Sequence, residues 1–311
     1  FCCAMWGCMS RCGGRRGWVA QDRTALSSAT REARRKCYRQ ATNGIDIAAR
    51  FRYLFGWSPH AEYRILANMS PTFLRPGEHT DERVALVALL SEKSMPKAHL
   101  AAIVEQLGSA VTLLQSIYHG TVDQQPLLDP VPSEVIERAA AEVASWAQMP
   151  YRVVSVFDEA YPSSLRDIHD RPPLIFTEGD ASLLERTGVA VVGTRTATDL
   201  GKRRAAKLAR DIGKHGFVIV SGLAEGIDTA AHTAALDADI PTVAVLGTGL
   251  TRTYPKGNAT LARRIVESGG ALVSQFLPKT SPIAANFPQR NITMSGLAVA
   301  TIVVEASHTS G

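Results

Sequence analysis

The sequence predicts an α/β protein in which a small all-helical domain precedes a Rossmann-like domain, whose mostly parallel sheet carries helices on both faces. Two observations predict the sheet. From Val189 onward, short β-branched runs alternate with helical segments, and each run is almost continuously apolar. Such runs are typical of parallel strands that are buried on both faces. A third observation predicts the helical domain, because residues 81–146 repeat apolar side chains at helical spacing between glycine turns.

Residues 1–80 differ from the rest of the chain. All five cysteines lie within the first 37 residues, among Arg, Gly and Trp, at spacings that match no zinc pattern. Apolar periodicity is not sustained here, so we expect an atypical, poorly ordered leader. The remaining residues contain no cysteine, which favours a reducing compartment, and we expect a cytoplasmic protein. No run of about 18 apolar residues is present, so we expect no membrane span.

The net charge of +5 is informative only after it is divided along the chain. Residues 1–60 hold 11 Lys and Arg against 3 Asp and Glu, whereas residues 189–311 hold 13 against 8. The basic leader therefore accounts for much of the cationic excess. The positive charge of the carboxy-terminal half is the part that suggests an anionic partner.

Residues 81–148 predict the small helical domain. Apolar positions in Leu100–Gly108 follow the i, i+3, i+4, i+7 spacing up to a glycine stop, and Ala110–Gly120 repeats this arrangement. A proline-rich linker then precedes a helix expected over Ser133–Trp146. Helical modules of this kind more often serve packing than binding.

Residues 149–311 predict the Rossmann-like domain, which we expect to be incomplete at its carboxyl end. It opens with an apolar run after Tyr151. Right-handed crossovers place the carboxyl ends of parallel strands at one edge, where ligands are expected. The later strands are expected at Val189–Gly193, Phe217–Ser221, Thr242–Gly247, Ala271–Gln275 and Thr301–Glu305, with helices at Asp199–His215, Ile227–Ala238, Asn258–Ser268 and Arg290–Ala298.

Four loops at these carboxyl ends contain residues suited to phosphate. Glycine permits close backbone approach, helix N-termini present N–H groups, and arginine offers a planar charged fork. Cations spaced between aromatic faces suit a single-stranded nucleic acid, because phosphates pair with the cations and bases stack on the rings. The candidate DNA- and phosphate-binding residues are Gly193, Thr194, Arg195, Ser221, Gly222, Gly226, Lys256, Asn258, Phe287, Arg290 and Asn291.

The same loops do not favour catalysis. Glu225, Asp228 and Glu305 each stand alone, without a paired carboxylate or a histidine cluster. Asp228 is expected to satisfy N–H groups at a helix start, and His232 to be buried and hydrogen-bonded. We therefore expect a protein that is not an enzyme, with no catalytic residue, metal ligand or cofactor.

Two nucleotide-binding folds are disfavoured by the motifs. No G-x-x-x-x-G-K-[ST] segment is present, which argues against a P-loop ATPase. The first loop reads Gly-Thr-Arg instead of G-x-G-x-x-G, and Ser221 ends the strand at which dinucleotide folds carry an acid for the ribose. NAD binding is therefore not expected.

At these residues the sequence resembles the DNA-processing protein A (DprA, also called Smf) family. The resemblance implies a Rossmann-like homodimer that binds single-stranded DNA and loads the RecA recombinase during natural transformation and recombination. It also implies that Arg195, Lys256 and Arg290 hold phosphates, that Ser221, Gly222 and Gly226 shape the pocket, and that Phe287 packs against a base. The matching segments are Tyr161–Leu165 with Pro172–Leu174, Gly193–Arg195, Ser221–His232, Ala244–Gly247, Tyr254–Asn258, Phe287–Asn291 and the final Ser310-Gly311.

The sequence departs from this family at two positions. Ile292 follows Arg290-Asn291, where the family often has a further arginine, and Gln275 replaces the usual glutamate. One alternative is a nucleotide phosphoribohydrolase of the lysine-decarboxylase-like group, but its P-G-G-x-G-T loop is absent. Another alternative is a structural scaffold whose pocket binds no ligand. Basic residues at three separate loop ends disfavour this alternative.

Overall fold

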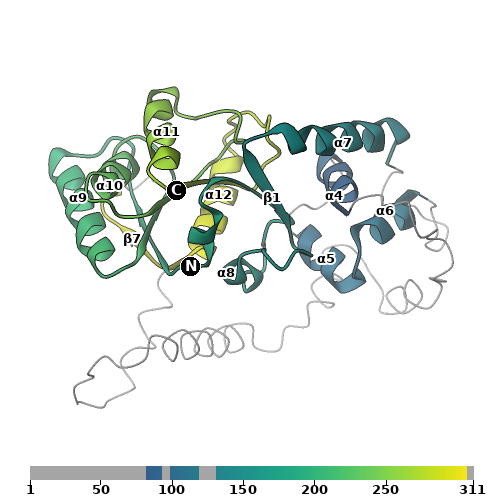
Figure 1. The fold of residues 1–311 in the computed structure, drawn as a ribbon, viewed down its shortest axis with the longest axis horizontal. Coiled ribbons are helices and arrows are strands. Elements are labelled where there is room, and N and C mark those ends of the chain that lie inside the picture. Colours follow the sequence, from purple (N-terminus) through teal and green to yellow (C-terminus); the bar gives the residue numbers. More distant parts are fainter. Residues whose placement is uncertain (1–81, 93–98, 119–130, 307–311) are drawn as a thin grey trace, which may run out of the picture. The chain divides into compact units, whose positions relative to one another are not determined.

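A mixed sheet of seven strands lies within residues 151–303 (Figure 1). This computed structural model describes residues 82–92, 99–118 and 131–306. All of them belong to one compact unit, Phe73–Gly311. The expected leader at residues 1–80, the end of the Ala110–Gly120 segment, most of the proline-rich linker and the final Ser310-Gly311 lie outside the described residues.

The strand order is β1-β2-β6-β5-β4-β3-β7. Neighbouring strands from β6 to β7 are parallel, while β2 pairs antiparallel with both β1 and β6. This arrangement confirms the predicted α/β, Rossmann-like fold with a mostly parallel sheet. The strands are β1 (Tyr151–Ser155), β2 (Leu174–Gly179), β3 (Gly188–Val192), β4 (Val218–Ser221), β5 (Thr242–Val245), β6 (Ala271–Ser274) and β7 (Ala298–Val303).

Helices cover both faces of this sheet. The chain moves in one direction along the sheet from β3 to β6, so right-handed crossovers place α9, α10 and α11 on one face. It then returns to the opposite edge at β7, which places α12 on the other face, where it packs against α8 and β7. The helices of this part are α8 (Ser163–Arg166), α9 (Asp199–Lys214), α10 (Ile227–Leu236), α11 (Ala259–Glu267) and α12 (Asn286–Gly296), with short 3-10 turns η5 (Ala181–Glu185) and η6 (Lys256–Asn258).

Two predicted boundaries near the carboxyl end were wrong. The last helix was expected from Arg290, but α12 begins at Asn286. Pro288 does not prevent this start, because N–H groups in a first helical turn have no intrahelical partner. The last strand was expected over Thr301–Glu305, but β7 begins at Ala298, directly after α12, and pairs with β3 from Gly188 onward.

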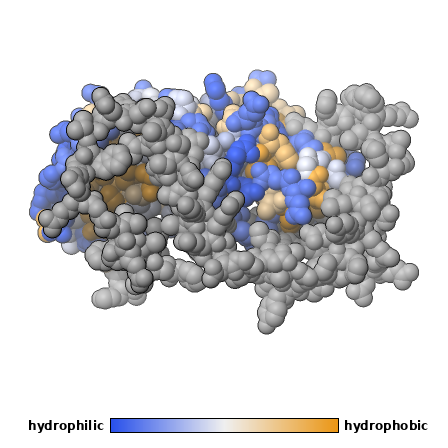
Figure 2. Space-filling view, turned by 90° about the horizontal axis from the view of Figure 1, so that it is seen from below, coloured by the Kyte–Doolittle hydropathy of each residue, from blue (hydrophilic) through white to orange (hydrophobic). Residues whose placement is uncertain are grey.

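Strand β7 forms one edge of the sheet and exposes Val299 and Val303. In the view from below, hydrophobic residues appear between hydrophilic ones toward the end of the molecule that carries α9 and β7 (Figure 2). The central strands β4, β5 and β6 are buried along their full length, as their apolar sequences predicted.

The amino-terminal described residues are helical. Gly108 ends α5 in the left-handed conformation, with φ of 75°, as expected for a glycine stop. Helix α4 packs against α6 and α7, and the Trp146 ring meets the Phe176 ring of β2 edge to face at 5.0 Å. The helices are α4 (Glu82–Ser91), α5 (Leu100–Leu107), α6 (Ala110–Tyr118) and α7 (Ser133–Ser145), followed by η4 (Trp146–Gln148).

The boundary proposed between residues 148 and 149 stays a prediction, since one hydrophobic cluster continues from α4 into the sheet. In the part of the chain that the structure describes, no helix is both long enough and apolar enough to cross a membrane.

Candidate nucleic-acid interface

Three side chains from separate segments meet at the carboxyl edge of the sheet. Arg195 follows β3, Tyr254 follows β5, and Phe287 lies in the first turn of α12. The Arg195 guanidinium carbon lies 5.1 Å from the centre of the Phe287 ring, and the Tyr254 and Phe287 ring centres are 5.7 Å apart. Arg195 and Tyr254 are exposed and Phe287 is half-buried. We call Tyr254 and Phe287 the aromatic platform. The exposed Arg195 guanidinium lies over the Phe287 ring, and the Tyr254 ring beside it is exposed.

Arg290 lies one turn further along α12, beneath this platform. Its guanidinium donates to the carbonyl oxygens of Gly222 and of Val245, the latter at 2.6 Å, while its Nε donates to Asn291 Oδ1 at 3.0 Å. The side chain is 6% exposed, and burial lowers the pKa of the guanidinium, an effect that nearby Asp228 opposes. Arg290 therefore joins the ends of β4 and β5 to α12, with Asn291 as one of its partners.

Asp228 organises the loop between β4 and α10. Its Oδ2 accepts the backbone N–H groups of Gly222 and Ala224 at 3.1 and 3.3 Å. These groups belong to the loop before α10, so Asp228 holds the loop and, contrary to expectation, does not cap the first turn of the helix. Burial raises the pKa of the Asp228 carboxyl, and the Arg290 charge and the two N–H groups act against this rise. The Ser221 hydroxyl is also buried and donates to the Val191 carbonyl oxygen at 2.7 Å. Ser221 thus supports the loop from inside.

Glycines allow the first two loops to touch. Gly226 has φ of +80°, and a Cβ there would lie 2.4 Å from the Thr194 carbonyl oxygen. A Cβ on Gly193 would lie 2.6 Å from Ile227, and the Thr194 N–H donates to the Glu305 carbonyl oxygen at 2.8 Å. The backbones of the two loops therefore approach each other closely, a contact that was not predicted from the sequence, and it sets the position of Arg195.

The third loop contributes one internal and one exposed residue. Asn258 is buried, and its Nδ2 donates to the Leu223 carbonyl oxygen at 2.8 Å and to Thr229 Oγ1 at 2.9 Å. Lys256 begins η6 and is exposed. Asn258 thus fixes the loop that presents the Lys256 charge.

Glu305, which the sequence analysis left as an isolated acid, has a structural partner. Its carboxylate accepts the Thr198 hydroxyl at 2.9 Å and the Thr198 N–H, and Thr198 in turn caps α9. This contact joins the segment after β7 to the start of α9. Only the proximity of the two strands creates it, so no local sequence signal could have revealed it.

Cations on α9 that were not predicted from the sequence line a neighbouring groove. Lys202, Arg203 and Arg210 line a groove between α9 and α10 that reaches Gly226 and Asn258. Arg203 and Arg210 are seven residues apart, so the helical period could have placed them on one face. Glu225 and Asp237 also line this groove, and Lys202 pairs with Asp199 at 3.7 Å, so the groove has only a small excess of positive charge.

Comparisons with known proteins point to one family. The profile of the family described as DNA recombination-mediator protein A matches residues 152–311. Protein Smf of Escherichia coli (strain K12) is 40% identical over 167 residues, which cover 53% of this chain and 45% of that protein. DNA processing protein DprA of Streptococcus pneumoniae is 41% identical over 157 residues, which cover 50% of this chain and 55% of that protein. The chain spans about half the length of these curated relatives.

A solved structure agrees with these matches. The X-ray structure of DprA from Streptococcus pneumoniae aligns with a TM-score of 0.57 at 31% sequence identity. The alignment covers 73% of this chain and 77% of that chain. The similarity therefore extends beyond the residues that the family profile matches.

Proposed function

We propose a function for this chain, which belongs to the DNA recombination-mediator protein A family. It binds single-stranded DNA at the carboxyl edge of the sheet and delivers that DNA to a RecA-type recombinase. DNA uptake in natural transformation and recombination is the setting proposed for this activity. The proposal includes a homodimer in the cytoplasm and no catalytic step.

The observation that carries the proposal is the contact of Arg195 with the aromatic platform. A base can stack on an exposed ring face only when it is not paired in a duplex, and such stacking contributes roughly 1–3 kcal/mol per base. A guanidinium 5.1 Å from the Phe287 ring centre stands where the phosphate beside a stacked base needs a cation. The pair therefore favours a single strand over a duplex.

The candidate residues divide into two roles in this proposal. Arg195 and Lys256 are exposed and contact phosphates, and Phe287 with Tyr254 receives a base. The buried side chains of Ser221, Asn258 and Arg290, which already have internal partners, hold the loops in place, together with Asn291 and the glycines at 193, 222 and 226. Thr194 offers its hydroxyl at the half-buried start of the first loop.

The state of the acids supports binding without catalysis. Asp228 accepts two backbone N–H groups, and Glu305 accepts from Thr198. A general base or nucleophile needs a carboxylate that can approach the reacting atoms. In the loops that the structure describes, these two acids act on the protein itself. The third acid, Glu225, is exposed and has no second carboxylate in its loop, and this arrangement disfavours the phosphoribohydrolase alternative.

Fluorescence anisotropy of the full chain tests the binding step. A labelled oligo(dT) and a duplex of equal length are titrated over a series of salt concentrations. We expect preference for the single strand and a linear fall of log K with log salt. Arg195→Ala should weaken binding and reduce the salt slope by about 0.7, the value for one phosphate contact on a single strand.

Phe287→Leu separates stacking from charge. This variant should lose about 1–3 kcal/mol of binding free energy with no change in salt slope, because it removes a ring and no cation. Arg263→Ala is the matched control, since Arg263 is an exposed arginine on α11. Equal affinities for single strand and duplex, or an Arg195→Ala protein that binds like the control, would refute the proposal. The basic leader is the same in all variants and cannot produce these differences.

The recombinase step is tested separately. We expect the chain to shorten the lag of RecA assembly on DNA that is coated with single-strand-binding protein, and Arg195→Ala to shorten it less. Sedimentation velocity tests the homodimer. Unchanged assembly kinetics alongside intact DNA binding would refute recombinase loading alone.

A further inference from the structure

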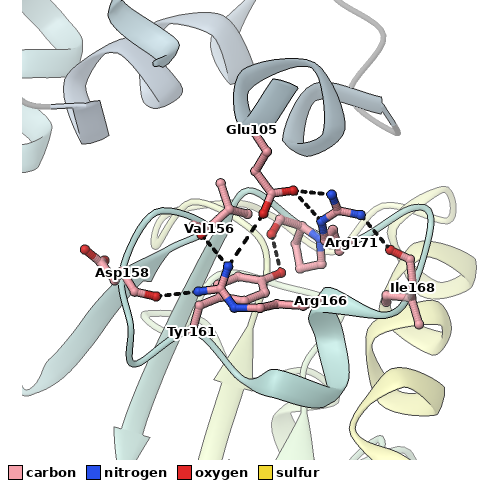
Figure 3. Close-up of polar contacts among 8 residues, drawn as sticks. Glu105, Val156, Asp158, Tyr161, Arg166, Ile168 and Arg171 are labelled. Atoms are coloured by element: carbon pink, nitrogen blue, oxygen red, sulfur yellow. Dashed lines mark hydrogen bonds and ion pairs between the residues drawn. The ribbon is translucent and has the colours of Figure 1, made fainter. Parts of the chain in front are cut away.

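A polar network joins α5 to the loop between α8 and β2, on a different part of the chain from the DNA-binding loops (Figure 3). Glu105 of α5 accepts from Arg171 Nε at 2.7 Å and also from Arg171 Nη2, and it pairs with Arg166 at 3.6 Å. Arg166 donates to the Val156 and Asp158 carbonyl oxygens at 2.8 and 2.6 Å. The loop and the helix are therefore fixed together by half-buried charges.

This contact brings three potential metal ligands into one cluster. His99 stands at the start of α5, and His169 and Asp170 lie in the loop between Arg166 and Arg171. Asp170 Oδ1 lies 2.8 Å from His169 Nδ1 and 3.9 Å from His99 Nδ1. The two imidazole rings meet edge to face, with centres 5.0 Å apart. One ligand atom from each of the three residues lies within 4.8 Å of the others.

The geometry points to a binding site for a zinc-class divalent cation, formed by His99, His169 and Asp170. Ligand atoms around a tetrahedral zinc ion lie about 3.3 Å apart, given bond lengths of about 2.0–2.1 Å. The Nδ1 atoms and the carboxylate oxygen therefore need small side-chain rotations to surround an ion. When the ion is bound, its bonds to His169 and Asp170 replace the hydrogen bond between these two side chains.

The donor set selects the class of metal. Two imidazoles and one carboxylate suit zinc, cobalt or nickel, whereas calcium and magnesium require several oxygen ligands. The three side chains are 29–40% exposed, so an ion can reach them and a water molecule can complete the coordination. His99 lies on a different segment from His169 and Asp170, so the ion would reinforce the contact that Glu105 and Arg171 make.

The test uses the full chain after reduction and alkylation of its five cysteines, which would otherwise bind the same metals. Zinc chloride is titrated by calorimetry and cobalt chloride by visible absorption. We expect one tight equivalent, cobalt d–d bands typical of a tetrahedral site, and a rise in Tm of about 5 °C at saturating zinc.

Variants of the ligands provide the decisive comparison. His169→Ala and Asp170→Asn should each weaken zinc binding about tenfold or more and abolish the cobalt bands, since even partners outside the coordination sphere contribute about 10–100-fold. His215→Ala is the matched control, because His215 is exposed at the end of α9. Asp170→Asn keeps the size of the side chain, so it serves if His169→Ala does not fold.

The outcomes are distinct. Loss of binding in the ligand variants and its retention in His215→Ala support the site. Unchanged affinity in Asp170→Asn, or the absence of a tight equivalent in the alkylated chain, would overturn it. DNA binding is not part of the readout, so the result is independent of the proposed function.

Discussion

His232 provides a pH dependence of stability that can be worked out from its hydrogen bonds. The side chain lies in α10 and is fully buried, with Nδ1 2.8 Å from Thr242 Oγ1. The Thr242 hydroxyl donates to the Ile219 carbonyl oxygen at 2.8 Å, so its oxygen accepts from His232 and Nδ1 carries the proton. Nε2 is then the unprotonated nitrogen, and it is buried without a hydrogen-bond partner among the described residues.

Protonation of Nε2 would create a charge in this buried position. Burial, with a smaller contribution from the Arg290 charge, lowers the pKa of His232 from 6.5 to about 3. Between pH 6.5 and 3 the unfolded chain therefore binds one more proton than the folded protein. The stabilisation is complete above pH 6.5 and is lost as the pH falls through this window. From pH 7.5 to 5.0 the loss in free energy of unfolding is about 2 kcal/mol.

His232→Asn removes this titration. The Asn amide retains an N–H donor near the position of Nδ1 and can still donate to Thr242. We therefore expect the variant to lose about 2 kcal/mol less than the wild-type protein between pH 7.5 and 5.0, whatever its stability at pH 7.5. Urea unfolding followed by circular dichroism at both pH values provides the measurement.

His215→Asn is the control, because His215 is exposed at the end of α9. Asp228 contributes with the opposite sign. Its raised pKa makes the folded state gain stability as the pH falls, and this contribution remains in the His232 variant. If the wild-type protein and His232→Asn lose the same free energy of unfolding within about 0.5 kcal/mol, then His232 is not a buried neutral imidazole.

Three further substitutions test the loops and the α5 contact through the free energy of unfolding. Gly226→Ala places a Cβ 2.4 Å from the Thr194 carbonyl oxygen and should cost about 2–4 kcal/mol. Gly216→Ala, at a similar φ with open space around it, should cost about 1 kcal/mol. Equal losses would contradict the close approach of Gly226 to Thr194. Asn258→Ala removes two buried hydrogen bonds and should cost about 1–3 kcal/mol, and a neutral result would show that the loop does not depend on it. Glu105→Gln should cost about 1–2 kcal/mol because it leaves the partly buried Arg171 and the exposed Arg166 without their anion. Glu267→Gln, in an exposed helical pair, should change stability by less than about 0.5 kcal/mol, and a similarly small effect of Glu105→Gln would mean that the α5 contact is weak.

The sequence by itself determined the parallel strands β3 to β6 and the edge at which their loops meet, whereas β2 was not predicted and β7 was expected to begin three residues later than it does. β-branched apolar runs such as Thr242–Val245 specify buried strands locally, and right-handed crossovers then place the following loops together. The requirement for glycine at Gly226 was also readable, because a tight turn between a strand and a helix is a local property. These features depend on neighbours in the chain, so periodicity and turn chemistry are sufficient to predict them.

Only the tertiary structure decided which loop residues face outward. Arg195 and Arg290 look equivalent in the sequence, yet Arg195 is exposed beside Phe287 and Arg290 is buried against the Gly222 and Val245 carbonyl oxygens. The helix start at Asn286, four residues before the predicted one, turns Arg290 inward. Carbonyl groups from distant strand ends create that environment, and no local pattern records them.

The contact between α5 and the loop before β2 was likewise decided only by the tertiary structure. Glu105 and Arg171 are 66 residues apart, and each alone resembles an ordinary surface charge. Packing of the helices against the sheet brings them together and carries His99 toward His169 and Asp170. Helical periodicity was sufficient to predict α5, but the partner of its charged face depends on long-range packing that the sequence does not display.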